Sequence, residues 1–247
     1  MDALVASWSA FWADAGVDSD FLDDPRDWLA EAKPADNPQK GERQPARAVA
    51  PRETAKPKIG GPRESWPQTL EDFRSWWMSA PMLDEAPATS RVAPAGKAGA
   101  RLMVLVSDPA ADDRAGEAGA LLSGTDGRML DAMLAAMGLT REDCYLASAL
   151  PRHTPAPDWR QLHEDGLGEL LRHHVALARP RLLAVFGRDT VRMIAPERFD
   201  GSAMTGSISL EGGEIPLIAG YPLGVMATRP QRKALWWQCW LGLSQTA

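Results

Sequence analysis

Residues 101–107 read Arg-Leu-Met-Val-Leu-Val-Ser, and every position from 102 to 106 is apolar. A strand with one face in water alternates apolar and polar side chains, whereas a strand covered on both faces is apolar throughout. The stretch therefore predicts a buried strand of a largely parallel sheet that carries helices on both faces.

Strand-like and helix-like patterns alternate along the rest of the domain. We expect further strands at 144–150, 181–186 and 215–219. We expect helices that end near 78–81 and at Gly138, a long helix from about Asp158 to Ala178, a short one at 189–194 and a last one after Pro230. The sequence thus predicts a three-layer α/β/α fold around a central, mostly parallel, four-stranded sheet.

The carboxyl ends of parallel strands are where sheets of this kind bind their ligands. The four expected strands run into segments 107–110, 148–151, 186–188 and 220–223. These segments are therefore the expected place of a functional site.

The acidity of the chain is concentrated near its N-terminus. The net charge is −6, and residues 1–30 carry seven acidic residues against one basic residue. Residues 31–66 carry eight basic residues, five acidic residues and six prolines. They predict a disordered basic tether, because so few apolar side chains cannot offset the chain entropy. Residues 67–247 hold the strand and helix patterns and form the predicted folded domain.

An amphipathic helix is predicted within residues 1–30. Its apolar face carries side chains at i, i+4, i+7 and i+8, namely Leu4, Trp8, Phe11 and Trp12. We interpret this face as a docking site for a protein partner, because a helix that packs on its own domain seldom needs so long a tether. The alternative is a helix that folds back and covers its own domain.

The composition indicates a cytoplasmic protein. Apolar residues make up 45% and charged residues 24% of the 247 residues, and there are only two cysteines. No apolar run approaches the roughly 20 residues that span a bilayer, so no membrane partner is expected. The negative net charge also argues against a protein that coats nucleic acid with a broadly basic surface.

Five segments of the predicted domain carry a family likeness. They read Leu-Met-Val-Leu-Val-Ser-Asp-Pro (102–109), Gly-Thr-Asp-Gly-Arg-Met-Leu-Asp-Ala-Met-Leu-Ala-Ala-Met-Gly-Leu (124–139), Glu-Asp-Cys-Tyr-Leu-Ala-Ser (142–148), Leu-Ala-Arg-Pro-Arg-Leu-Leu-Ala-Val-Phe-Gly-Arg (177–188) and Tyr-Pro-Leu (221–223). In order and spacing they resemble the uracil-DNA glycosylase superfamily over roughly residues 70–243, and most of all its iron–sulfur-containing bacterial branch. Members of this family flip uracil out of DNA and hydrolyse its glycosidic bond.

The resemblance implies roles for three residues at the strand ends. Asp108 stands where a residue positions water, Ser148 where an asparagine reads the base edge, and Tyr221 where a histidine stabilises the departing uracil anion. Ser148 is too short to read a base edge with two hydrogen bonds. The ring of Tyr221 either donates a hydrogen bond to an anion or fills the pocket, and we expect the second. An Asp-Pro pair also follows the first strand in a branch without metal, where the Asp orients water, so catalysis by Asp108 stays an alternative. We favour the other interpretation, in which the pair is turn chemistry at a strand end.

The resemblance to the iron–sulfur branch does not extend to its cluster. The places where four cysteines would fall are 77–81, 151–153 and about 167, and none of them contains cysteine. Cys144 lies within an expected strand and Cys239 within the last expected helix, and neither position suits a cluster ligand. We therefore expect no iron–sulfur cluster and no other metal or cofactor.

Basic residues are the expected contacts to DNA. By their position in the family, Arg229, Arg232 and Lys233 approach the phosphate backbone, and Arg188, which ends an expected strand, is a further candidate contact. The alternative is a solvated helix start. The segment 123–127 either cradles a phosphate or caps the following helix, and we favour the cap. Three histidines lack the spacing of a metal site, namely His163, His173 and His174.

A second resemblance involves both ends of the chain. Residues 8–17, 101–108 and 229–238 resemble the psi subunit of the bacterial clamp-loader complex, a glycosylase-like fold without the active site that docks through an N-terminal peptide. Three hypotheses follow: a non-catalytic interaction module in DNA replication or repair that docks through residues 1–30, an active glycosylase that uses Asp108, and a DNA-binding remnant without a docking partner. We favour the first, because it explains both the altered site and the tethered aromatic segment.

Overall fold

The computed structural model describes residues 58–115, 120–196 and 204–244. These residues belong to one compact unit, Glu53–Ala247. The predicted docking segment 1–30 and most of the tether 31–66 lie outside the described residues, so both stay predictions.

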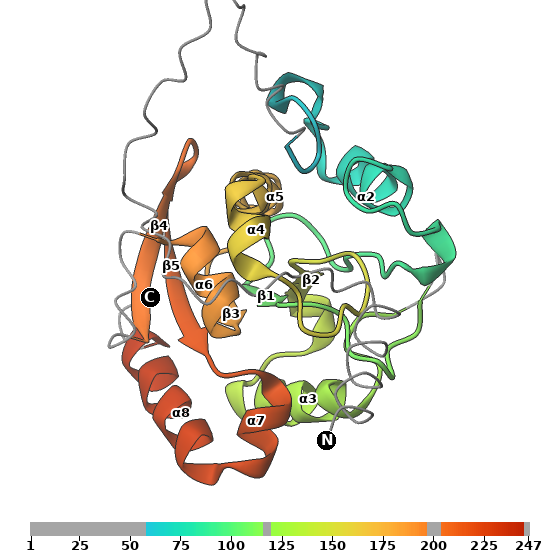
Figure 1. Cartoon of the computed structure of the whole chain (residues 1–247). Helices are drawn as coiled ribbons and strands as arrows, with labels where there is room; N and C mark the ends of the chain where they lie inside the picture. The colour runs from blue at the N-terminus through green and yellow to red at the C-terminus, as the bar shows by residue number, and fades with distance from the viewer. Residues whose placement is uncertain (1–57, 116–119, 197–203, 245–247) are drawn as a thin grey trace, which may run out of the picture. The chain divides into compact units, whose positions relative to one another are not determined.

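A five-stranded sheet forms the centre of the domain (Figure 1). Its strands are β1 Leu102–Val106, β2 Cys144–Ser148, β3 Leu183–Phe186, β4 Thr205–Leu210 and β5 Gly213–Gly220, in the order β2-β1-β3-β5-β4. The four predicted strands are all present and parallel to one another, while β4 pairs antiparallel with β5 at the edge. The mostly parallel α/β sheet is confirmed, with one strand more than the sequence predicts.

The added strand has a weak sequence pattern for a physical reason. β4 reads Thr-Gly-Ser-Ile-Ser-Leu, and of its six residues only Ile208 is buried. An edge strand with one buried side chain lacks the continuous apolar run that marks the inner strands. β4 is held in the sheet by its antiparallel backbone pairing with β5.

Helices cover both faces of the sheet (Figure 1). The α-helices are α2 Leu70–Ser79, α3 Thr125–Met137, α4 Trp159–Glu164, α5 Leu167–Ala178, α6 Arg188–Ile194, α7 Leu223–Thr228 and α8 Pro230–Ser244. Short 3-10 turns occur at η1 Arg63–Ser65, η2 Ala88–Ser90 and η3 Arg141–Asp143. No helix in the described part of the chain is long and apolar enough to cross a membrane.

Alternation along β1 divides the core into two layers. Met103 and Leu105 pack in one cluster with side chains of α2, α5 and α6. Leu102, Val104 and Val106 pack in the other cluster, with side chains of α3, α7 and α8. The three-layer α/β/α architecture that the sequence predicts is therefore confirmed.

The predicted long helix over 158–178 is wrong in one respect, because two helices occupy this range. α4 begins after Asp158, whose carboxylate accepts a hydrogen bond from the Gln161 N–H (3.0 Å). The chain then turns at Gly166, where φ is +90°, and α5 starts at the next residue. Glycine adopts this left-handed conformation without the steric penalty of a side chain, so the apolar pattern continues across a real break.

The last residues of the predicted tether pack on the domain. Trp66 is buried, and its indole Nε1–H donates to the Gly60 carbonyl (3.0 Å). The Ile59 N–H donates to the Asp165 carbonyl (2.8 Å) at the break between α4 and α5. Packed chain therefore extends back to Lys58, before the predicted domain start at residue 67. Ile59 and Trp66 supply the apolar surface for this packing, although the composition of residues 31–66 as a whole is proline-rich and poor in apolar residues.

Candidate functional site

A small cavity lies where the sequence predicts the site, at the carboxyl ends of β1 and β3. Its volume is about 130 Å³. The lining includes Asp108 from the segment after β1, His153 from the segment after β2, Asp126 from α3 and Leu223 from α7. Ligand pockets for small molecules usually measure about 300 to 1,000 Å³, so this cavity is small for one.

Asp108 is held in place by the segment after β2. Its carboxylate accepts a hydrogen bond from the Thr154 N–H (3.1 Å) and lies 3.2 Å from His153 Nδ1. His153 Nδ1 also lies 3.0 Å from the Pro109 carbonyl. Because both neighbours of Nδ1 are acceptors, these contacts favour a proton on Nδ1.

His153 is a site residue that the sequence reasoning missed. It is 45 residues from Asp108 in the chain, so no local pattern joins the two. The signal available was its place just beyond β2, because parallel strands bring their carboxyl ends to one edge of the sheet. Its side chain is 45% exposed, so the pair with Asp108 is open to solvent.

Ser148 does not face the small cavity. It is buried at the end of β2, and its hydroxyl donates to the Leu150 carbonyl at 2.7 Å. A hydroxyl group has one proton to donate, and here that proton is used within the turn. Ser148 is therefore not presented to a base.

Tyr221 lies on a neighbouring cavity of about 340 Å³ instead of the Asp108 cavity. The Arg232 guanidinium is centred 3.9 Å from the centre of the Tyr221 ring, which is a cation–π contact. Arg188 lines the same cavity, while Arg229 and Lys233 are exposed at the start of α8 and do not line it. The structure thus brings Arg188, Tyr221 and Arg232 to one cavity, while Asp108 lines the adjoining one, and Pro222 lines both.

Two aspartates occupy the N-terminal end of α3. The Asp112 carboxylate accepts hydrogen bonds from the N–H and hydroxyl of Thr125 (2.8 and 3.1 Å), and these bonds lower the pKa of Asp112. Asp113 accepts from the N–H groups of Leu122 and Ser123, at 3.0 and 2.7 Å. The N–H groups of the glycine-containing segment are therefore bonded to carboxylates of Asp112 and Asp113, while its own N-cap residue, Gly124, makes no side-chain cap.

Asp126 is the second carboxylate on the small cavity. Burial, with the neighbouring charges of Asp112 and Asp113, raises the pKa of Asp126. The Gly224 N–H bonds to its carboxylate and acts in the opposite direction. The cavity thus combines a paired carboxylate at Asp108 with a less acidic one at Asp126.

The segments that would carry the cluster cysteines are joined by an arginine. Arg91 is 2% exposed, and its guanidinium donates to the carbonyls of Trp77 (2.9 Å), Ala86 (3.2 Å) and Asp84. The Asp84 carboxylate in turn pairs with Arg152 at 2.7 Å. These contacts tie the end of α2 to the segment after β2.

The side chains present do not fit an iron–sulfur cluster. Such a cluster needs four ligands, usually thiolates, and the chain has two cysteines. Burial raises the pKa of Cys144 to about 11, and its thiol donates to the Thr140 carbonyl (3.3 Å). Cys239 lies on α8, on a different element. Neither cysteine belongs to the segments that Arg91 joins.

The three histidines that follow Asp158 have separate environments. Burial lowers the pKa of His174 to about 3, and its Nε2 lies 2.8 Å from the Tyr145 hydroxyl. His173 Nε2–H donates to the Pro67 carbonyl at 2.7 Å. Within the described ranges, no three His, Cys, Asp or Glu side chains are grouped to hold a metal ion.

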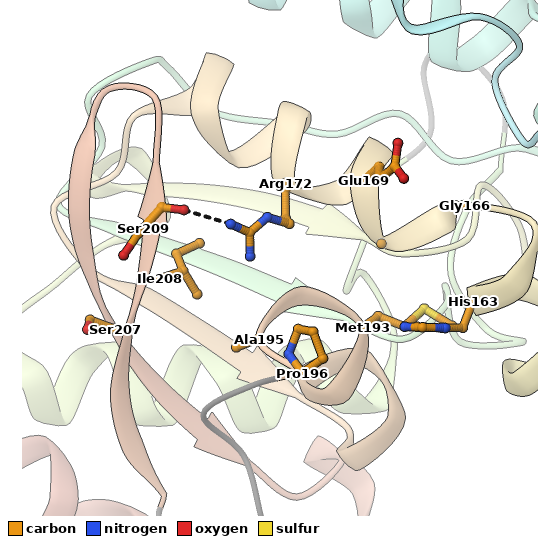
Figure 2. A pocket seen from close by; sticks show the side chains of 11 residues that line it. His163, Gly166, Glu169, Arg172, Met193, Ala195, Pro196, Ser207, Ile208 and Ser209 are labelled. Carbon is orange, nitrogen blue, oxygen red and sulfur yellow. Dashed lines mark hydrogen bonds between the residues drawn. The ribbon is translucent and has the colours of Figure 1, made fainter.

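A further cavity of about 380 Å³ lies between α5, the end of α6 and β4 (Figure 2). His163 lies on its rim, and Arg172 reaches across it. The Arg172 guanidinium donates to the carbonyls of Ile194 (2.9 Å) and Ser209 (2.7 Å), so it joins α6 to the edge strand. None of the site residues predicted from the sequence lines this cavity.

The predicted partner-binding residues cannot be placed beside this site. Leu4, Trp8, Phe11 and Trp12 lie outside the described residues. Their role stays a prediction.

Comparison with known proteins agrees with the architecture. The model of the uracil DNA glycosylase superfamily matches residues 93–241, more than half of the chain. The match begins just before β1 and ends within α8, so it includes every strand. Comparison with curated proteins found no match. The sheet order, the segments at the strand ends and the family match together show that the chain belongs to the uracil-DNA glycosylase superfamily.

Proposed function

We propose that this chain is a non-catalytic member of the superfamily that acts as an interaction module in DNA replication or repair. In this proposal residues 1–30 dock on a protein partner, such as a clamp loader, in the manner of the psi subunit. No iron–sulfur cluster or other cofactor takes part. The observation that carries the proposal is that the three positions to which the resemblance gives catalytic roles do not line one cavity: Asp108 and Tyr221 line two adjoining cavities, and Ser148 is bonded within its own turn.

Glycosidic hydrolysis needs those three positions to converge on one base. A carboxylate must meet the sugar while donors fix the base edge and the departing anion, and misplacement of such groups by about 1 Å costs about a hundredfold in rate. Here Asp108 lines one cavity, Tyr221 lines another, and the Ser148 hydroxyl is bonded to Leu150. The arrangement supports loss of uracil excision.

The first test is uracil excision by the full chain in excess over substrate. A uracil-containing oligonucleotide, incubated with the protein and then treated with alkali, is expected to remain intact. An active glycosylase of the superfamily serves as the positive control. Strand scission by this chain that disappears in Asp108→Asn would contradict the proposal.

The second test concerns the docking face. Aromatic anchors usually supply most of the affinity of such contacts, so Trp8→Ala with Trp12→Ala should remove the partner in affinity purification. Trp28→Ala is the matched control, because it removes the same side chain from the same segment but from outside the predicted face. Replication or repair proteins should copurify with the unchanged chain and the control. Equal recovery by all three would remove this support.

A second candidate function, an active glycosylase, rests on the pair of Asp108 and His153. A histidine oriented by a carboxylate is an arrangement that activates water or stabilises charge. If the pair catalyses, His153→Gln should lower any measured scission about as strongly as Asp108→Asn does. Scission that is unchanged in both variants would exclude this pair.

A further inference from the structure

The cavity beside Tyr221 has an apolar lining and a basic rim. Side chains of Val191, Met204 and Ala219 line it, and Arg188 and Arg232 approach it from α6 and α8. Its volume of about 340 Å³ lies within the range of small-ligand and side-chain pockets. An apolar group of a ligand therefore fits here beside two guanidinium groups.

The cations around this cavity are not neutralised by the described part of the domain. Arg188, Arg229 and Lys233 are exposed and Arg232 is half-buried, and none of the four forms an ion pair with a described carboxylate. Some exposed arginines elsewhere, such as Arg160 with Glu164, have such partners, and others, such as Arg101 and Arg181, do not, so it is the grouping of four cations near one cavity that distinguishes this region. Positive charges without nearby carboxylates raise the local positive potential and attract an anionic partner.

The Tyr221 ring argues for a carboxylate-bearing partner over a nucleic acid. Binding of single-stranded nucleic acid relies on aromatic faces on which bases stack. One face of Tyr221 is covered by Arg232, and Phe186 and Trp236 are buried against each other. The guanidinium groups can pair with carboxylates or phosphates through two parallel hydrogen bonds, so the preference for a peptide rests on the aliphatic lining and the covered aromatic face.

We propose that this cavity binds an acidic peptide segment of a protein partner. One apolar side chain of the peptide enters between Val191 and Met204, and neighbouring carboxylates pair with Arg188 and Arg232. The site lies on the domain and is separate from the predicted docking face in residues 1–30. It therefore stands or falls independently of the function proposed above.

The test is fluorescence anisotropy with the full chain and a labelled peptide, Asp-Asp-Asp-Leu-Asp-Asp-Asp. Arg188→Glu and Arg232→Glu should each weaken binding about tenfold or more, because each replaces an attraction by a repulsion. Arg181→Glu is the matched control: Arg181 is also exposed, but it precedes β3, whereas Arg188 follows it. This control should stay within about twofold of the unchanged chain, since Arg181 lies at the opposite end of the strand.

Two further probes decide between ligand classes. A peptide with serine in place of leucine should bind about tenfold more weakly, because it loses the buried apolar side chain. Single-stranded and duplex oligonucleotides, tested with the same variants, report on nucleic acid. Peptide binding that depends on both arginines and on the leucine supports the proposal. The proposal is overturned if the peptide does not bind, if Arg181→Glu weakens it as much as Arg188→Glu, or if only the oligonucleotides show the dependence on the arginines.

Discussion

Two regions of this domain use arginine in opposite ways. Around Arg91, where the cluster cysteines of the bacterial branch would fall, every described guanidinium contact is made within the domain. At the carboxyl ends of β3 and β5, Arg188 and Arg232 face a cavity and lack a carboxylate partner among the described residues. The same residue type is thus a buried connector in one region and an open contact in the other.

The difference shows how one side-chain type serves two purposes, inside the domain and at its rim. Inside the domain each buried polar group needs a hydrogen-bond partner, because an unsatisfied group costs about 1–3 kcal/mol of stability. A position at the rim has water as a partner, so it tolerates unpaired charges and remains available for a ligand. Stability and binding experiments can therefore test the two regions separately.

The largest effect is expected for Arg91→Ala. The substitution leaves buried carbonyls of Trp77, Asp84 and Ala86 without a donor and opens a cavity, so the free energy of unfolding should fall by about 3 to 5 kcal/mol. Urea unfolding followed by circular dichroism measures this loss. The exposed Arg181→Ala serves as control and should change the value by no more than about 0.5 kcal/mol. A loss below about 1 kcal/mol for Arg91→Ala would remove the contrast between the regions.

Acid should weaken the same side of the sheet through His174. Its pKa is about 3 in the folded chain against an ordinary value of 6.5, because the ring is buried next to Phe73, with ring centres 4.2 Å apart. Below pH 6.5 the His174 ring becomes protonated in the unfolded chain, whereas in the folded chain it stays neutral down to about pH 3. Stability from this residue is therefore constant above pH 6.5 and falls as the pH drops towards 3, by about 2 to 3 kcal/mol over the first two pH units.

Two substitutions check this assignment. His174→Gln removes the titration and should flatten the decline of stability between about pH 6.5 and 4.5, as measured by urea unfolding at each pH. His163→Gln replaces an exposed histidine and should leave the decline unchanged. A decline that persists in His174→Gln would assign it to other groups.

The inner strands and the helix ends could be predicted from the sequence, because their signals lie in neighbouring residues. Leu102 to Val106 are apolar throughout, which marks a strand covered on both faces. Gly138 ends α3 with φ at +69°, the conformation that favours glycine after a helix. Both signals lie within a few residues of the feature that they predict, so they need no knowledge of the tertiary structure.

The rest depends on partners far along the chain. Arg91 is buried because carbonyls of two other segments surround it, and a lone arginine in a sequence predicts a surface position. The pairing of Asp108 with His153 likewise appears only when two strand ends meet. The family resemblance placed Asp108, Ser148 and Tyr221 near strand ends, but side-chain bonding decided which cavity, if any, each one lines.

The smallest effect on stability is expected at the cavity beside Tyr221, where Arg232 has no carboxylate partner among the described residues. Arg232→Ala removes a half-exposed cation–π contact with Tyr221, which is worth about 0.5 to 1 kcal/mol at such a site, and it uncovers no buried acceptor with a described bond to this side chain. The free energy of unfolding should therefore fall by less than about 1 kcal/mol, measured in urea beside Arg91→Ala. Tyr221→Leu should cost a similar amount, because it removes the other half of the same contact, and the double variant should cost less than the sum of the two. If Arg232→Ala instead destabilises the domain as much as Arg91→Ala, then Arg232 holds the structure together as Arg91 does. Its lack of a carboxylate partner would then no longer argue for a ligand at this cavity.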